Sequence, residues 1–312
     1  MDVLRGFPRQ PQRPAAGVLA LGTFDGVHRG HQALLGTAVR RAAQRGEPSA
    51  AVTFDPHPLQ VIAPPPEPFL LTTLDERLEL LAALGLSAAY VIHFDETFRR
   101  LSAEDWVDLL HARVGMAEVV CGANYTFGRD RSGNVDVLRA LAGARGFEVH
   151  VAPQVHVGGT LVNSTLIRRL IRTGDVREAA RFLGRWYAVG GPVERGDARG
   201  RTLGFPTANL EIAEEKLLPG AGIYAAFAAT EEGVRQAAVS VGTRPTFGPG
   251  ALTVEAYLLD FSGDLYGQSV NLRFVQRLRE EIAFTSEAAL VRQIQDDVAE
   301  TRRVLQGLPP VE

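Results

Sequence analysis

The stretch that decides the fold is VLALGTFDGVHRGHQALL, residues 18–35 of the 312-residue chain. It starts with a short apolar run, continues through glycines that include Gly26 and Gly30, and then places apolar residues at helical spacing. This order predicts a β-strand, a tight turn and an α-helix. His28 and His31 fall where the helix begins, so the turn is also the first candidate for a functional site.

Working outward, the same alternation of strand and helix continues through the first half of the chain. Strands that alternate with helices predict a parallel sheet covered on both faces. Ligands of such sheets bind beyond the carboxyl ends of the strands, where the loops 23–31, 55–58 and 122–134 lie. The expected strands are 18–22, 50–54, 88–94, 117–122 and 147–152.

The second half of the chain has a different pattern of segments. From Trp186 onward the segments are short, β-rich and separated by Gly and Pro, which predicts an antiparallel barrel or sandwich. A final helix is expected from about Ser286. We therefore expect an α/β first domain at 1–184 and a β-rich second domain at 185–312.

Composition excludes several classes of protein. The formal net charge is -3, so no overall positive field favours a nucleic-acid partner. Cys121 is the only cysteine, which excludes an internal disulfide and fits a reducing compartment. No apolar run reaches the ~20 residues of a membrane helix, and no secretory signal is present. A cytoplasmic protein without a membrane partner is expected.

The rarest residue types narrow the chemistry further. Lys216 is the only lysine and no GxxxxGK motif occurs, so ATP chemistry of the P-loop type is excluded. All seven histidines lie between His28 and His156, so the second half has no imidazole to use.

His28 and His31 share one face of the expected helix at its N-terminus. Free backbone N–H groups there favour an anion, and Gly26 and Gly30 would let the backbone approach a phosphate. Two imidazoles could donate hydrogen bonds to the charge that grows on a leaving pyrophosphate. A helix cap beside a surface histidine is the alternative. A metal site is a third reading, but no third ligand has helpful spacing.

The glycine-rich run ERGDARGRTLGFPTANL, residues 194–210, is the second candidate site. Its glycines permit a backbone nest around an anion. If the segment is extended, Thr207 and Asn209 point to the same side and offer the oxygens that Mg²⁺ bridging phosphates prefers. An ordinary β-turn is the alternative.

Glu255 is the candidate base of the second half. The strand LTVEAYLLDF, residues 252–261, places it in register with Tyr257 and Leu259. A carboxylate at this position could accept a proton from an alcohol. A solvent-facing glutamate without a role is the alternative.

GTFDGVHRGH (22–31) resembles the His-x-Gly-His signature of the nucleotidyltransferase superfamily. With the motifs that follow it in order, the chain resembles the prokaryotic bifunctional riboflavin kinase/FAD synthetases. These motifs are TFDPHP (53–58), GANYTFGRDRSGN (122–134), NSTLIRR (163–169), GRTLGFPTANL (200–210), SVGTRPTFG (240–248) and VEAYLLDFSGDLYG (254–267).

The resemblance implies two reactions. A Rossmann-like N-terminal nucleotidyltransferase domain would transfer the adenylyl group of ATP to FMN, giving FAD and pyrophosphate. A C-terminal antiparallel β-barrel that ends in a helix would phosphorylate riboflavin with ATP to give FMN. Mg²⁺ is the implied cofactor, and riboflavin, FMN, FAD and ATP are the implied partners. The resemblance leaves the oligomeric state open.

The resemblance also implies site residues. In the first domain, the ATP-binding residues would be Gly22, Phe24, Gly26, His28, Gly30, His31, Ser164, Thr165 and Arg168, with His28 and His31 catalytic. The flavin would contact Asp55, Asn124, Phe127 and Arg129. In the kinase, ATP would bind Gly200, Arg201, Gly204, Phe205, Pro206, Thr207 and Asn209, with Mg²⁺ on Thr207 and Asn209 and with Glu255 as the base.

The chain departs from the family pattern in one motif. Asn163 stands where the family commonly has a serine, and Leu166 stands where a polar residue is frequent. A plain helix cap at Ser164 is the alternative for this segment.

Two other functions remain open. One is an adenylyltransferase with another acceptor and a non-catalytic C-terminal domain. The other is a flavin- or RNA-binding regulatory module that kept the signatures but lost turnover.

Overall fold

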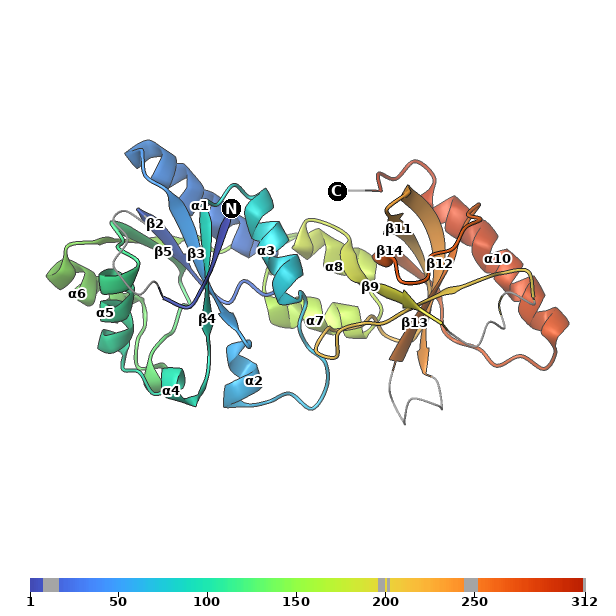
Figure 1. Cartoon of the computed structure of the whole chain (residues 1–312), viewed down its shortest axis with the longest axis horizontal. Coiled ribbons are helices and arrows are strands. Elements are labelled where there is room, and N and C mark those ends of the chain that lie inside the picture. The colour runs from blue at the N-terminus through green and yellow to red at the C-terminus, as the bar shows by residue number, and fades with distance from the viewer. Residues whose placement is uncertain (8–16, 196–199, 201–202, 244–251, 311–312) are drawn as a thin grey trace. The chain divides into compact units, whose positions relative to one another are not determined.

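The chain folds into two compact units, which Figure 1 shows as a computed structural model. The structure describes residues 1–7, 17–195, 200, 203–243 and 252–310. The first unit contains Met1–Glu67 and Thr72–Asn163, and the second contains Pro68–Leu71 and Ser164–Glu312.

The first unit is built on a six-stranded sheet in which all neighbours are parallel, as predicted. Strand order is β1-β4-β3-β2-β5-β6, so the order reverses at β2. The loops that follow β2 and β5 therefore lie at the topological switch point, where open parallel sheets bind ligands. The strands are β1 (Asp2–Arg5), β2 (Val18–Leu21), β3 (Ser49–Asp55), β4 (Ala88–His93), β5 (Glu118–Gly122) and β6 (Glu148–Ala152).

Helices cover both faces of this sheet (Figure 1). Ala20 of β2 belongs to a core cluster with α1 (Arg29–Arg45) and α3 (Leu74–Ala83). Its neighbour Leu19 belongs to the opposite cluster with α5 (Ala103–Arg113) and α6 (Val135–Arg145). Burial on both faces explains why the strands read as continuous apolar runs. The shorter elements are α2 (Pro58–Ile62), α4 (Glu96–Arg99), η1 (Arg129–Arg131), β7 (His156–Val157) and β8 (Thr160–Leu161).

Local signals set the helix starts. His28 is the N-cap of α1. At α3, Thr73 and Glu76 form a reciprocal capping box: Thr73 N donates to Glu76 Oε2 at 2.8 Å, and Glu76 N donates to Thr73 Oγ1 at 3.3 Å. The spacing of Thr73 and Glu76 is the one that this motif requires.

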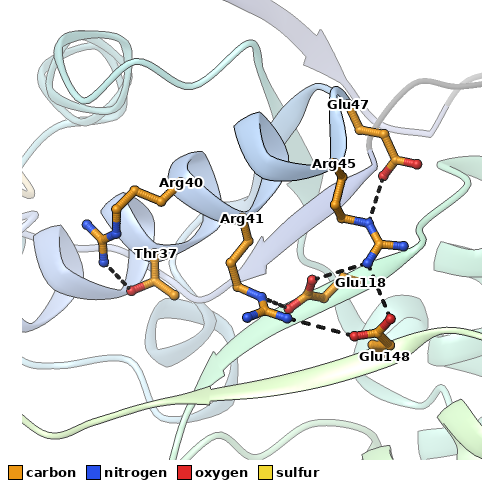
Figure 2. Close-up of polar contacts among 7 residues, drawn as sticks. All are labelled: Thr37, Arg40, Arg41, Arg45, Glu47, Glu118 and Glu148. Atoms are coloured by element: carbon orange, nitrogen blue, oxygen red, sulfur yellow. Dashed lines mark hydrogen bonds and ion pairs between the residues drawn. The ribbon is translucent and has the colours of Figure 1, made fainter.

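A charged cluster connects α1 to the amino ends of the strands (Figure 2). The Glu118 carboxylate at the start of β5 is fully buried and accepts from Arg41 Nε. Arg45 Nη1 donates to Glu148 Oε1 at 3.3 Å, at the start of β6. The amino ends lie at the sheet edge opposite the ligand-binding loops, so this cluster belongs to the fold.

The second unit contains a closed six-stranded antiparallel barrel, ordered β10-β13-β12-β11-β14-β9. The predicted β-rich half is therefore a barrel. Its strands are β9 (Tyr187–Glu194), β10 (Ala208–Leu210), β11 (Gly222–Thr230), β12 (Gly233–Thr243), β13 (Leu252–Leu258) and β14 (Ser269–Arg279).

Helices pack on the outside of the barrel. α10 (Glu287–Leu305) begins after its N-cap Ser286, as predicted. α7 (Ser164–Arg172) and α8 (Val176–Leu183) also belong to this unit. Ala180 of α8 and Leu305 of α10 share one core cluster with barrel residues. The two helices before residue 185 thus pack with the barrel, and the predicted domain boundary at 184/185 stays a prediction.

The segment Pro68–Leu71 belongs to the second unit although it lies between elements of the first. Leu70 pairs in parallel with Lys216, and Leu217 N donates to Leu70 O at 2.9 Å. The only lysine of the chain is buried and donates from Nζ to Leu71 O at 2.9 Å.

Among the helices of the described residues, none has the length and apolar character needed to cross a membrane.

Candidate active sites

The turn between β2 and α1 has an unusual backbone. Phe24, Gly26 and Val27 have φ of 51°, 82° and 35°, in the left-handed region that non-glycine residues rarely adopt. Phe24 and Val27 are also buried. Such conformations persist where the surroundings hold them, and they concentrate at functional sites.

Thr72 holds this turn from the side of α3. The buried Asp25 carboxylate accepts from Thr72 N at 3.0 Å and from Thr72 Oγ1 at 3.2 Å, and Gly26 N donates to Thr72 Oγ1 at 3.0 Å. The backbone of the turn is therefore fixed by side-chain contacts from outside it.

The two predicted histidines lie together. The rings of His28 and His31 stack with centroids 3.6 Å apart and an interplanar angle of 16°, and Phe24 meets His31 edge-on at 5.4 Å. His31 N donates to His28 Nδ1 at 3.3 Å. Because His28 Nδ1 accepts this hydrogen bond, the neutral ring carries its proton on Nε2. The Nε2–H group can then donate a hydrogen bond to a ligand.

Gly30 makes room for this pair. A Cβ built on Gly30 would lie 3.1 Å from Cε1 and 3.2 Å from Nδ1 of His28. Gly30 has no left-handed φ, whereas Gly26 has one. The sequence interpretation gave both glycines the same task, close approach to a phosphate. The structure separates them: Gly26 serves the turn and Gly30 the imidazole.

A cavity of about 870 Å³ opens beside the turn. Gly22, Phe24 and His31 line it from the β2–α1 side. Most of its remaining wall is aromatic or aliphatic, and its polar lining residues include His31 and Asn124. The aromatic wall consists of Phe54, Phe94, Phe98, Trp106, Tyr125 and Phe127.

The predicted flavin contacts separate into two groups. Asn124 and Phe127 line the cavity, and the Phe127 ring stacks on Tyr125 with centroids 5.4 Å apart. Asp55 ends β3 and is half-buried, and Arg129 has an exposed side chain; neither is among the lining residues. Their predicted contacts with the flavin stay predictions.

His57 of the TFDPHP motif stands between two prolines, so a rigid structural turn is the alternative to a site role, and His57 lines the cavity. It is also the N-cap of α2: Leu59 N donates to His57 Nδ1 at 3.1 Å, and His57 N donates to Gln60 Oε1 at 2.8 Å. The rigid structural turn that formed its alternative interpretation is thus present as well.

Three predicted phosphate-binding residues, Ser164, Thr165 and Arg168, begin α7 in the second unit. Thr165 is exposed and Ser164 is half-buried. Arg168 Nε donates to Phe69 O at 2.8 Å, and its guanidinium lies over the Phe69 ring at 5.2 Å. Arg168 thus helps to hold the segment 68–71, and its contact with phosphate stays a prediction.

The candidate kinase residues meet on the barrel. Thr207 Oγ1 donates to Glu255 Oε2 at 3.2 Å. Asn209 pairs directly with Glu255 across β10 and β13. Thr207 and Asn209 are half-buried while Ala208 and Leu210 are buried, so the predicted shared side is confirmed.

Glu255 has a more polar setting than the strand pattern indicated. It lies on the half-exposed side of β13 with Tyr257, while Val254 and Ala256 face the core. Its cross-strand neighbours are Asn209 and Ser240. The carboxylate therefore lies among polar side chains on the half-exposed side of the strand.

A second cavity, of about 490 Å³, is lined by Thr207 but not by Asn209 or Glu255. Pro206 and Thr207 line it, and the loop 261–266 after β13 forms its other wall. Phe205 meets Tyr257 edge-on at 5.4 Å, Gly204 has a φ of 86°, and Gly200 accepts from Phe205 N at 2.8 Å. Predicted Arg201, like Gly196 of the same glycine-rich run, lies outside the described residues.

Sequence reasoning missed the aromatic wall at Phe94, Phe98 and Trp106, and it missed the loop 261–266 as a cavity wall. Each wall combines segments that are distant in sequence. Aromatic residues after expected strand ends were the available signal.

Comparisons with known proteins match the two halves of the chain to two different activities. A family model described as FAD synthetase matches residues 10–166, and one described as riboflavin kinase matches residues 183–305. A bifunctional riboflavin kinase/FMN adenylyltransferase of Listeria monocytogenes is 37% identical over 91% of each chain. The protein of the same name from Bacillus subtilis is 33% identical over 95% of each chain.

One solved structure resembles the whole chain, with a TM-score of 0.88 and 31% identity over 97% of this chain and 99% of the other. It is described as a macrolide-efflux protein from Streptococcus pneumoniae. The two matched domains, the relatives that share both activities and the two ligand-sized cavities agree with one another. The chain belongs to the bifunctional riboflavin kinase/FMN adenylyltransferases, enzymes that use ATP to phosphorylate riboflavin and to adenylylate FMN.

Proposed function

We propose that each activity belongs to one of the two cavities. FMN adenylylation is assigned to the cavity beside His31, and riboflavin phosphorylation to the cavity beside Thr207. The observation that carries this division is the stacked pair His28 and His31 at the N-terminus of α1, of which His31 lines the aromatic cavity. The barrel offers a hydroxyl, an amide and a carboxylate instead.

In the first reaction, a phosphate oxygen of FMN attacks the α-phosphorus of ATP, and the bond to the β-phosphate oxygen breaks. FAD and pyrophosphate result. His28 and His31 donate hydrogen bonds to the pyrophosphate as its charge grows, and the N-terminal N–H groups of α1 assist. Asn124 and the aromatic wall orient the flavin, so positioning supplies much of the rate.

In the second reaction, the 5′-hydroxyl of riboflavin attacks the γ-phosphorus of ATP, giving FMN and ADP. Glu255 accepts the hydroxyl proton. The Thr207 hydroxyl donates to this carboxylate and fixes its orientation. Mg²⁺ fits the oxygen donors of Thr207 and Asn209, because it needs few protein ligands when phosphates and waters complete its shell. When bound, Mg²⁺ neutralises phosphate charge.

Replacement of both histidines tests the first assignment. His28→Ala/His31→Ala should lower FAD formation from added FMN by about 10²-fold or more, since two donors to the leaving group are lost. Phosphorylation of riboflavin by the same chain should be unchanged. Equal loss of both activities in a folded double variant would contradict the division.

Glu255→Gln tests the second assignment. FMN formation should fall by about 10²-fold or more, because the amide cannot accept the proton. Added FMN should still be converted to FAD at the normal rate. Chromatography of the flavin products separates the two outcomes. Normal FMN formation by this variant would require another base.

The boundary at 184/185, the cytoplasmic location and the absence of a nucleic-acid partner stay predictions. Shortened chains test the boundary, as argued below. Cell fractionation tests the location, and gel-shift titration with RNA tests the regulatory alternative.

A further inference from the structure

Arg77 is a buried cation that the two reactions do not use. It lies on α3 and is 2% exposed. Its Nη1 donates to Thr53 Oγ1 and to Phe54 O, both at 3.0 Å, at the carboxyl end of β3. Burial lowers the pKa of this guanidinium, and the charges of Asp25 and Asp55 oppose that effect. Burial of a charged group costs free energy, and hydrogen bonds to fixed acceptors offset part of that cost.

What Arg77 holds is the strained turn. Thr53 is fully buried, and its Oγ1 donates onward to Thr23 O at 2.8 Å. A continuous path of hydrogen bonds therefore runs from Arg77 through Thr53 to the residue before Phe24. Phe24 has the left-handed φ of 51° and packs edge-on against His31.

The charges near the turn also favour a role for Arg77 in holding it. Asp25 is 1% exposed, and its carboxylate is held within the turn by Thr72. An unbalanced carboxylate behind a phosphate-binding turn would repel a triphosphate. Arg77 interacts electrostatically with Asp25 and Asp55 and so offsets their charge, and it is not among the residues that line the cavity.

We propose that Arg77 is a positioning residue of the FMN adenylyltransferase: acting through Thr53, it fixes the turn that presents His28 and His31. The proposal rests on the role assigned above to the two histidines. It predicts an effect on turnover by a side chain that contacts neither substrate.

Steady-state kinetics of the full-length chain tests this. Arg77→Met and Thr53→Val should each lower kcat for FAD formation by about tenfold or more, because displaced catalytic groups lose rate steeply. The KM for FMN should change less than about threefold. Thr53→Ser keeps the hydroxyl and should restore kcat. Riboflavin phosphorylation by the same chain should stay normal in every variant.

A variant that changes both Arg77 and Thr53 tests whether the two residues act through one path. If Thr53 relays the effect of Arg77, then Arg77→Met/Thr53→Val should be no slower than Arg77→Met alone. Arg40→Met is the matched control, because Arg40 is an exposed arginine of α1 that bonds only Thr37 in the described structure. Losses that multiply in the double variant, or a normal kcat in folded Arg77→Met, would overturn the proposal.

Two further outcomes are distinguishable. If Arg77→Met does not fold, the comparison of Thr53→Val with Thr53→Ser decides, since equal kcat values would overturn the relay. His31→Ala is measured in parallel. Normal FAD formation by His31→Ala would refute the proposed function itself, whereas its loss beside a normal Arg77→Met refutes only the positioning role.

Discussion

At the scale of single residues, α1 contains two glycines in different surroundings. Gly30 faces the His28 imidazole, and Gly36 faces only the flexible end of Arg40, whose Nη1 would lie 3.3 Å from an added Cβ. Neither glycine has a left-handed φ. The pair therefore separates a steric role at the site from the general cost of glycine in a helix.

Gly30→Ala should displace the His28 ring, because the new methyl group would lie 3.1–3.2 Å from two ring atoms. We expect FAD formation to slow about tenfold. Gly36→Ala should keep full activity and raise stability by about 0.4–1 kcal/mol. Assays of both activities with urea unfolding check this. Equal activity of the two variants would show that the ring needs no such space.

Cys121 gives a prediction about pH. It is fully buried in β5, and burial raises its pKa from 9.0 to about 11. As pH rises, the thiol of the unfolded chain therefore loses its proton before the thiol of the folded chain. The contribution of the buried neutral thiol to the free energy of unfolding is present below pH 9 and is lost as pH rises toward 11. Between about pH 8 and pH 10 the free energy of unfolding should fall by about 1 kcal/mol through this thiol.

Urea unfolding of the wild type and of Cys121→Ala at both pH values measures this contribution. The alanine variant is less stable overall, but its stability should fall less steeply with pH. Parallel pH profiles would contradict the raised pKa of the thiol.

At the scale of elements, the sequence predicts most of the strands and helices, whose signals lie in neighbouring residues. Apolar runs and helical periodicity locate β2 to β6, α1 and the capping box of α3 because these features depend on neighbouring residues. β1 was not predicted, since its four residues lie at the sheet edge with mostly exposed side chains and pair only with β4. The contacts of Asp25 with Thr72 and of Arg77 with Thr53 join distant segments, and no local pattern indicates them.

The buried Glu118 carboxylate gives the prediction for element packing (Figure 2). Arg41→Met would leave this fully buried charge with only Arg45, whose Nη1 lies 3.9 Å from Oε2. We expect a loss of about 2–4 kcal/mol in the stability of the first unit, less than for a wholly buried pair because Arg41 is 32% exposed.

Arg41→Met/Glu118→Leu is the informative partner variant. It removes both charges, so it should recover much of the lost stability. Arg40→Met controls for loss of an exposed arginine from the same helix. If the double variant is less stable than the wild type, the ion pair contributes net stability.

At the scale of the whole molecule, sequence order and compact units do not coincide. Pro68–Leu71 belongs to the second unit, where all four of its carbonyls accept hydrogen bonds: from Arg172, Arg168, Leu217 and Lys216 in chain order. Periodicity could not predict this, because the segment has no repeat of its own. The same is true of α7 and α8, whose helical pattern continues the first half although they pack with the barrel.

Shortened chains test what α7 and α8 add. Residues 164–312 retain both helices, and residues 185–312 lack them. α8 buries Val176, Phe182 and Leu183 together with two alanines. Loss of this packing should cost about 3 kcal/mol or more and lower Tm by about 10 °C or more.

Both chains lack Pro68–Leu71, so the comparison isolates the two helices. Since neither chain contains His28 or His31, both should form FMN from riboflavin and neither should form FAD. Calorimetry gives the Tm values, and chromatography of the flavins gives the products. Equal Tm values would mean that the helices do not stabilise the barrel. Loss of FMN formation only in residues 185–312 would move the start of the kinase domain from residue 185 to residue 164, because α7 and α8 would then be required for its activity.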